Sequence, residues 1–204
     1  MKLAITALLA GSAAAFVPSV QKSSSFSLRM SFQNEVGAQA PLGFFDPLGL
    51  LKDADQTRFD RLRFVEIKHG RVAQLAFLGQ IVTRNGIHLS GPIDYAGHSF
   101  DSYPNGFAAI YGPDAIPASG LLQIVLFIGF LETFVMKNIE GTGNEFIGDF
   151  RNGALDFGWD TFDEATKTKK RAVELNNGRA AMMGILGLMM HEQIGGSFPI
   201  IGQM

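Results

Sequence analysis

The chain of 204 residues has the length of a single domain, and 47% of its residues are hydrophobic. It has no cysteine, which excludes a disulfide framework and a thiolate-bound metal. Its net charge of −2 does not fit the basic surface that nucleic-acid-binding proteins carry, so we expect no nucleic-acid partner.

Residues 1–30 have the composition of an addressing segment rather than of a folded element. Lys2 is followed by an apolar run and then by small residues up to Ala15, which is the pattern of a secretory signal peptide. A serine-rich segment without acidic residues follows Phe16. This bipartite order indicates a two-step route into a plastid enclosed by extra membranes, with residues 31–204 left as the mature domain. An ordinary secreted protein is the alternative interpretation.

Three apolar segments separated by Gly- and Pro-rich connections predict three helices, at about 57–84, 118–137 and 168–193. The first, with roughly 28 residues, is long enough to cross a bilayer when tilted. The second is the cleanest membrane signal, because residues 115–131 carry no charge. The fold class expected from this pattern is an all-α membrane protein with three transmembrane helices.

The positive charges predict the orientation of these helices. Lys and Arg are plentiful before the first helix and between the second and the third, whereas residues 85–117 contain none. The positive-inside rule therefore places the N-terminus and the second connection on one side of the membrane, here the stroma. Residues 85–117 are expected on the other side, the lumen.

One short pattern occurs twice, at residues 66–73 and again at residues 174–181. In both copies a Glu is followed after two residues by His or Asn, then Gly, Arg, any residue and Ala. Each copy leads into an apolar run, where an unpaired charge is expensive. Within one copy the Glu and the Arg lie about 140° apart around a helix, too far to pair with each other.

The two copies can instead neutralise each other. We expect Glu66 to pair with Arg179 and Glu174 to pair with Arg71, so that the first and third helices cross as a pseudo-two-fold pair. The glycine that precedes each arginine lets the two backbones approach closely. Two unrelated amphipathic helices with a chance charge pattern are the alternative.

Several polar side chains in the helices are candidates for binding a ligand. His69 and Asn177 each lie three residues after the repeat Glu, so each Glu shares one helical surface with its neighbour. His191 returns to nearly the same face about 21 Å further along the third helix, a spacing that suits two layers of large ligands. Gln123 is equally well explained by an interhelical hydrogen bond, and His191 by an interfacial position. The candidate ligands are Glu66, His69, Gln123, Glu132, Glu174, Asn177 and His191.

Four further motifs accompany the repeats, at residues 43–50, 127–132, 148–152 and 189–193. With the repeats and the three predicted spans, they resemble the chlorophyll-binding light-harvesting superfamily and, more narrowly, the fucoxanthin–chlorophyll a/c proteins of diatoms. The junction Ala-Ala-Phe-Val-Pro around residue 16 also resembles the plastid-import junction of diatoms and related algae. The resemblance covers nearly all of residues 1–198.

The resemblance implies that the candidate ligands bind the magnesium of chlorophyll axially, and that magnesium enters the protein only in this form. It implies chlorophyll a at Glu66, His69, Glu132, Glu174, Asn177 and His191, and chlorophyll a or c at Gln123. It also implies fucoxanthin, with diadinoxanthin as a further candidate, in the grooves of the crossed helices. The carotenoid head groups are then expected near Asp46, Pro47, Leu48, Asp156 and Phe157.

The function implied is that of an antenna, in which pigments capture light and pass excitation energy to photosystem I or II. No residue is expected to catalyse a reaction. The implied surroundings are the thylakoid membrane and its lipids, with other antenna subunits and a photosystem core as partners. Residues 167–170 and 99–117 depart from the usual pattern, which leaves open where the third helix starts and whether the loop holds a pigment.

Two alternatives remain at this point. A photoprotective member of the same superfamily quenches excitation, with a pH sensor in the predicted lumenal loop. The sensor candidates are His88, Asp94, His98, Asp101 and Asp114. A membrane di-iron carboxylate enzyme uses Glu66 and His69 as a Glu-x-x-His motif, but it needs a second such motif, and the second repeat has Asn177 in place of His.

Overall fold

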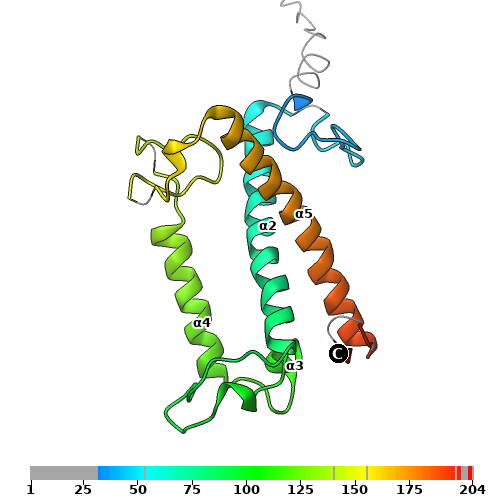
Figure 1. The fold of residues 1–204 in the computed structure, drawn as a ribbon, viewed down its shortest axis with the longest axis vertical. Coiled ribbons are helices and arrows are strands. Elements are labelled where there is room, and N and C mark those ends of the chain that lie inside the picture. Colours follow the sequence, from blue (N-terminus) through cyan, green and yellow to red (C-terminus); the bar gives the residue numbers. More distant parts are fainter. Residues whose placement is uncertain are drawn as a thin grey trace, which may run out of the picture.

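The computed structural model describes residues 32–52, 54–139, 141–154, 156–195, 197–198 and 202–203. The predicted addressing segment, residues 1–30, lies outside the described residues. Three long helices, α2, α4 and α5, form the body of the described chain, and Figure 1 shows α2 between α4 and α5 in this view. Two short strands, β1 (Ser197–Phe198) and β2 (Gly202–Gln203), pair antiparallel near the C-terminus.

Helix α2 runs from Gln56 to Arg84, one residue longer at its start than the predicted 57–84. Its first turn is capped by Asp55, whose Oδ1 accepts the backbone N–H of Arg58 at 2.9 Å. Such a cap satisfies one of the backbone donors that a helix start leaves without a partner. The cap therefore fixes the start of the helix that carries the first repeat.

Helix α5 runs from Glu164 to Ile194, so the predicted start at 168 is one turn too late. Residues 164–167 contain neither Gly nor Pro, and Glu, Ala and Lys among them favour helix. The acidic Glu164 in the first turn also suits the positive end of the helix dipole. At the other end Gly195 takes a left-handed conformation, with φ of 70°, and stops the helix.

Helix α4 runs from Ala118 to Phe130 and continues as a π-helical turn, η2, from Leu131 to Val135. The N–H of Met136 closes this turn on the carbonyl of Leu131 at 2.7 Å. Met136 itself has non-helical dihedral angles, φ −91° and ψ 42°, so the predicted end at 137 is two residues too late. A π-helical turn inserts an extra residue and is often found at functional sites.

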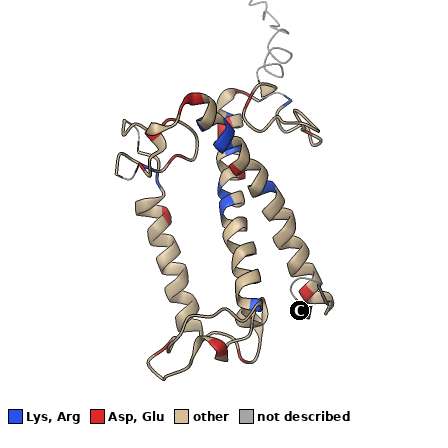
Figure 2. Ribbon diagram, viewed as in Figure 1, with Lys and Arg blue, Asp and Glu red and all other residues tan. Residues whose placement is uncertain are grey.

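The stretch Ala118–Val135 is the one helical segment among the described residues that is long and apolar enough to cross a membrane by length and composition. None of it is buried inside the chain. Helices α2 and α5, with 29 and 31 residues, have the length but carry the charged repeats. In Figure 2 most Lys and Arg of these two helices gather toward one end, and Arg84 lies in the last turn of α2, at its other end.

Helices α2 and α5 pack against each other around their glycines. A Cβ added to Gly70 would lie 3.0 Å from the Cα of Gly178, so the two backbones touch at this point. The small core around this crossing is apolar. It includes Ile67, Ala73, Leu175 and Ala181. From the crossing the helices separate toward the end where residues 85–117 lie (Figure 1).

The connections lie at opposite ends of the helices (Figure 1). Residues 32–55 and 136–163 lie at one end, the latter with the 3₁₀ turn η3 (Trp159–Thr161). Residues 85–117 lie at the other end, with η1 (Phe100–Ser102) and the short helix α3 (Ala108–Tyr111). We call the end with residues 32–55 and 136–163 the stromal-predicted end. The end with residues 85–117 is the lumenal-predicted end.

Candidate functional site

The first ion pair of the crossing joins Glu66 of α2 to Arg179 of α5. Nε of Arg179 lies 2.7 Å from Oε1 of Glu66. The other carboxylate oxygen of Glu66 accepts from Nη1 of Arg63 at 2.6 Å, a contact that the sequence reasoning missed. The spacing of Arg63 and Glu66 could have indicated this contact, because residues three apart share one surface of a helix. Two guanidinium groups therefore offset the charge of this carboxylate.

The second ion pair joins Glu174 of α5 to Arg71 of α2. Nε of Arg71 lies 2.6 Å from Oε1 of Glu174. The side-chain amide of Gln74 also donates to the backbone carbonyl of Glu174, at 3.3 Å. The structure thus brings both repeat glutamates against the arginine of the other helix.

Each repeat arginine also holds a connection in place. Nη1 of Arg179 donates to the carbonyl of Gly37 at 2.9 Å, and Nη1 of Arg71 donates to the carbonyl of Gly148 at 2.7 Å. Both glycines have positive φ, 108° and 86°, a conformation that favours glycine. The sequence reasoning missed these contacts, although a Gly-rich segment precedes each repeat helix.

The neutral candidate ligands lie on exposed helix surfaces. His69, Asn177 and Gln123 are exposed on α2, α5 and α4 respectively. Nδ1 of His69 lies 2.8 Å from the carbonyl oxygen of Val65. Because a carbonyl only accepts, Nδ1 carries the proton in this contact, and Nε2 is then the nitrogen that offers a lone pair.

Glu132, in the π-helical turn η2, forms an ion pair with Lys68 of α2. Glu132 is a predicted ligand, and its contact with Lys68 is not evident from the sequence, because the two residues lie on different helices. Nζ of Lys68 also lies 5.5 Å from the ring centre of Phe150. The pair links η2 to α2 and offsets the charge of the third candidate carboxylate.

His191 is exposed near the C-terminal end of α5, away from the two repeat ion pairs. The structure therefore places the repeat candidates at the helix crossing and Glu132 beside α2, whereas Gln123 lies on α4 and His191 at the lumenal-predicted end of α5. Among the described residues, no three His, Asp or Glu side chains converge on a metal position. The di-iron alternative, which needs Glu66 and His69 to share a metal with further carboxylates such as Glu132 and Glu174, is thus not supported by the described residues.

Two cavities flank the crossing, and each contains one of the repeat ion pairs. The first, of about 520 Å³, lies on the side of residues 32–51 and is lined by Phe44, Leu50, Phe59, Glu66 and Arg179 among others. The second, of about 750 Å³, lies beside residues 139–162 and is lined by Phe146, Phe150, Trp159, Glu174 and Arg71 among others. Both linings combine aromatic and aliphatic surface with the neutralised carboxylate of a repeat glutamate.

Three of the predicted head-group residues line these cavities, namely Asp46, Asp156 and Phe157. The carboxylate of Asp46 accepts the backbone N–H groups of Leu50 and Leu51 at 3.0 and 2.9 Å, so it shapes the turn in which it lies. Pro47 and Leu48 of that turn are exposed. On the other side Asp156 lines the second cavity together with Phe157, which is exposed and has a φ of 52°.

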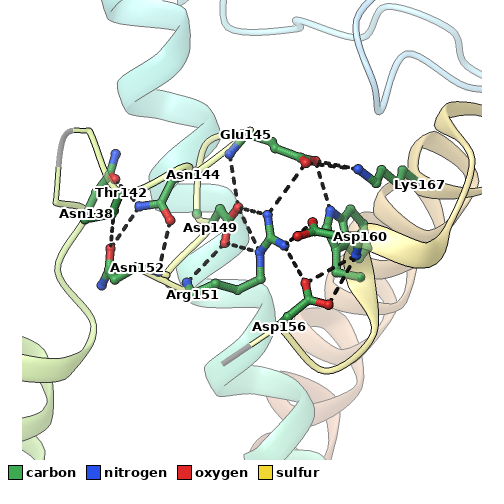
Figure 3. Close-up of polar contacts among 12 residues, drawn as sticks. Asn138, Thr142, Asn144, Glu145, Asp149, Arg151, Asn152, Asp156, Asp160 and Lys167 are labelled. Atoms are coloured by element: carbon green, nitrogen blue, oxygen red, sulfur yellow. Dashed lines mark hydrogen bonds and ion pairs between the residues drawn. The ribbon is translucent and has the colours of Figure 1, made fainter. Parts of the chain in front are cut away.

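A single guanidinium organises the connection around the second cavity (Figure 3). Arg151 lies 2.8 Å from Asp149 and 2.9 Å from both Asp156 and Asp160. Burial raises the pKa of Asp149, but the hydrogen bonds from Arg151 and from the backbone outweigh burial and bring the pKa below its ordinary value. The pKa of Glu145 is likewise low, because Trp159 and then Lys167 donate hydrogen bonds to its carboxylate.

The candidate pH-sensor residues form local pairs in the loop at 85–117. Nδ1 of His98 lies 2.6 Å from Asp94, and His88 contacts Asp101. The hydrogen bond from the His98 ring lowers the pKa of Asp94 below its ordinary value. Asp114 is exposed. A carboxylate with a lowered pKa stays charged during mild acidification, so Asp94 is unsuited to sensing a pH between 7 and 5.

Comparison with known proteins reveals close relatives. Residues 32–193 match the sequence profile of the family described as chlorophyll A-B binding protein. A chloroplastic fucoxanthin-chlorophyll a-c binding protein of Trieres chinensis is 75% identical over 204 residues, the full length of both chains. Protein E of the same description from Phaeodactylum tricornutum is 61% identical over 196 residues, 96% of this chain and 97% of its own. Protein B from Macrocystis pyrifera is 56% identical over 170 residues, 82% of this chain and 75% of its own.

Proposed function

Because the chain belongs to the chlorophyll a/b-binding protein family, we propose that the cavities beside its helix crossing are pigment sites and that the polar side chains around them are axial ligands of chlorophyll magnesium. The chain is a light-harvesting antenna protein that binds chlorophyll a, chlorophyll c and fucoxanthin, in line with the descriptions of its relatives. When bound, these pigments absorb light and transfer its excitation energy. The protein itself holds them at fixed positions.

The reciprocal Glu–Arg pairing carries the ligand proposal. Glu66 and Glu174 each accept from the arginine of the other helix, at 2.7 and 2.6 Å. A carboxylate whose charge is offset in this way can present an oxygen to magnesium, a metal that favours oxygen ligands, without adding net charge to an apolar site. Lys68 offsets Glu132 in the same manner.

The neutral donors complete the set. The contact between Nδ1 of His69 and the carbonyl of Val65 fixes the tautomer and orients the ring, as outer hydrogen bonds do for metal-bound histidines. Asn177 and Gln123 offer amide oxygens, and His191 a second imidazole. Carotenoid head groups are assigned to the turn at Asp46 and to the loop at Asp156. Diadinoxanthin is a further candidate there.

All three long helices are assigned to the thylakoid membrane, with α2 and α5 as a pseudo-two-fold pair. Their charges are offset within the bundle, which removes much of the cost of placing them at membrane depth. Residues 32–55 and 136–163, at one end, are assigned to the stroma, and residues 85–117 to the lumen. Residues 1–30 are assigned to plastid import and removal. The partners that follow are other antenna subunits, thylakoid lipids and a photosystem I or II core.

Substitution of single ligands tests the assignment. We expect His69→Leu and Asn177→Leu each to lose one chlorophyll per polypeptide, while the far-ultraviolet circular dichroism and the remaining absorption bands are kept. Thr57→Val, at an exposed position of α2, is the matched control and should keep every pigment. The measurement is pigment extraction together with absorption spectroscopy of the purified protein. An unchanged chlorophyll content in both ligand variants would overturn the assignment.

A further inference from the structure

Helices α2 and α5 face each other through residues spaced seven apart on α2. At the crossing Gly70 meets Gly178, with no side chain between the backbones. Two turns further along, the ring of Phe77 fills the space beside Gly184, where an added Cβ would lie 2.9 Å from Cε2. After two more turns comes Arg84. The side chains on this face of α2 therefore become longer as the helices separate.

At the widest point Arg84 reaches Glu192 of α5. Nη2 of Arg84 lies 3.0 Å from Oε2 of Glu192, and the two side chains are only 9% and 11% exposed. Nε of Arg84 is held by the side-chain oxygen of Gln80 at 2.9 Å. Taking both charges out of water is costly, and breaking such a buried pair leaves one charge uncompensated. The two residues are also 108 positions apart, the same interval that separates the two repeats.

Glu192 also shapes the connection at the lumenal-predicted end. Its Oε1 accepts the backbone N–H of Phe107 at 2.7 Å. The preceding Gly106 has a φ of 72°, and a Cβ added there would overlap the carboxylate of Glu192. Glycine is therefore required for the loop to close over this side chain. Phe107 and Glu192 also line a cavity of about 660 Å³, together with Arg84 and Tyr111 among others.

We propose that Arg84 and Glu192 are positioning residues: a buried brace that sets the separation of α2 and α5 at the lumenal-predicted end. The brace thereby places His191, the residue next to Glu192, and the loop at 105–112. It acts on the second layer of pigment, whereas the repeat ion pairs act on the first. The role in pigment placement rests on the proposed function of His191 as a ligand. The effect of the brace on the spacing of the helices does not depend on that function.

The spacing of the helices gives a test that does not depend on pigment assignment. The chain has no cysteine, so spin labels can be attached at Ile87→Cys and Ile194→Cys, both exposed positions near the two helix ends. We expect Arg84→Met to shift and broaden the distance distribution between the labels, and Arg84→Lys to restore most of it. Arg61→Met, at an exposed position near the other end of α2, is the control and should leave the distribution unchanged.

Pigment content tests the functional part of the proposal in the same variants without labels. His191→Leu first identifies the absorption band that depends on this residue. We expect Arg84→Met to lose or shift that same band while keeping the bands that depend on His69 and Asn177, and Arg84→Lys to retain it. A His191→Leu variant with unchanged pigments overturns the ligand role of His191 but leaves the spacing test valid.

Two results overturn the brace itself. One is an Arg84→Met protein whose label distances match those of the parent chain. The other is the loss of all pigment bands together both in Arg84→Met and in the milder variant Glu192→Gln, which keeps an acceptor for the N–H of Phe107. A general loss of this kind would not single out the second layer and would reject a specific positioning role.

Discussion

At the residue scale, the site depends on charges that are offset before any pigment binds. Each repeat glutamate accepts from an arginine of the other helix, and each of those arginines also donates to a glycine carbonyl of a connection. A charged hydrogen bond is worth about 1.5–3 kcal/mol, so these contacts stabilise the crossing as well as neutralise it. Each Glu–Arg pair therefore both stabilises the fold and prepares a carboxylate for ligand binding.

The reciprocal pairing followed from the repeat in the sequence, because two copies with one charge of each sign have one mutual arrangement that cancels both. The other contacts of these residues did not follow. Arg63 shares Glu66 with Arg179, and Lys68 contacts Glu132 from a different helix. Which of several nearby charges becomes a partner depends on distances across the bundle, and spacing along the chain does not contain these distances.

A pH prediction belongs to the carboxylates around Arg151. In the folded chain the pKa of Asp149 lies below its ordinary value of 3.8. Its contribution to stability is therefore present above that value and is lost as the pH falls through the lower, folded pKa. The low pKa of Glu145 acts in the same direction. We expect the loop at 141–154 to stay closed from pH 8 to 5 and to open only below about pH 4.

Hydrogen exchange of this loop, corrected for the intrinsic pH dependence of exchange, measures the opening. Asp149→Asn is the informative variant, because it removes the titrating group and should expose the loop to exchange at neutral pH as well. Lys52→Gln serves as the control, because Lys52 is exposed and lies in the segment before α2, outside the loop at 141–154. Opening of the unsubstituted loop already near pH 5.5 would contradict the prediction.

At the scale of the element, close approach of α2 and α5 depends on glycine at their contact. We expect Gly70→Ala to destabilise the protein by about 1–3 kcal/mol, because the added Cβ meets the backbone at Gly178 and forces the helices apart. Gly79→Ala, on the same helix, is the matched control, because nothing lies within 4 Å of the added atom. Alanine also favours helix more than glycine does, so this control should not lose stability.

The measurement is the midpoint of thermal loss of visible circular dichroism in the pigmented protein. We expect a higher midpoint for Gly79→Ala than for Gly70→Ala. Equal midpoints would show that backbone contact at the crossing does not contribute to stability. Gly178→Ala should behave as Gly70→Ala does, since the two glycines face each other.

The helices themselves were predicted well in their middle and less well at their ends. The apolar run and the absence of charge identified α4, but the π-helical turn at Leu131–Val135 has no signature in hydropathy. The predicted start of α5 at 168 is one turn too late, and the segment 167–170, which departs from the usual family pattern, had left this start open. Local propensity continues the helix back to Glu164, where Lys167 also contacts Glu145 of the neighbouring loop.

At the scale of the whole molecule, the arrangement of connections predicts how the chain lies in the membrane. The absence of cysteine again allows single labels to be placed. In sealed, right-side-out thylakoid vesicles, we expect an impermeant maleimide to label Phe157→Cys from the stromal side and to reach Tyr95→Cys only after detergent is added. Both positions are strongly exposed in the structure. Labelling of Tyr95→Cys in sealed vesicles would reverse or refute the assigned orientation.

The sequence by itself determined the three apolar segments, the charge asymmetry of their connections and the mutual pairing of the repeats. These are properties of composition and spacing, and the high cost of a lone charge in an apolar run leaves few ways to satisfy them. Only the tertiary structure decided that Lys68 offsets Glu132, that Arg151 gathers three aspartates and that Arg84 spans the widening gap to Glu192. These contacts depend on how far the helices diverge and where the loops fold back, and both are set by packing of the whole chain.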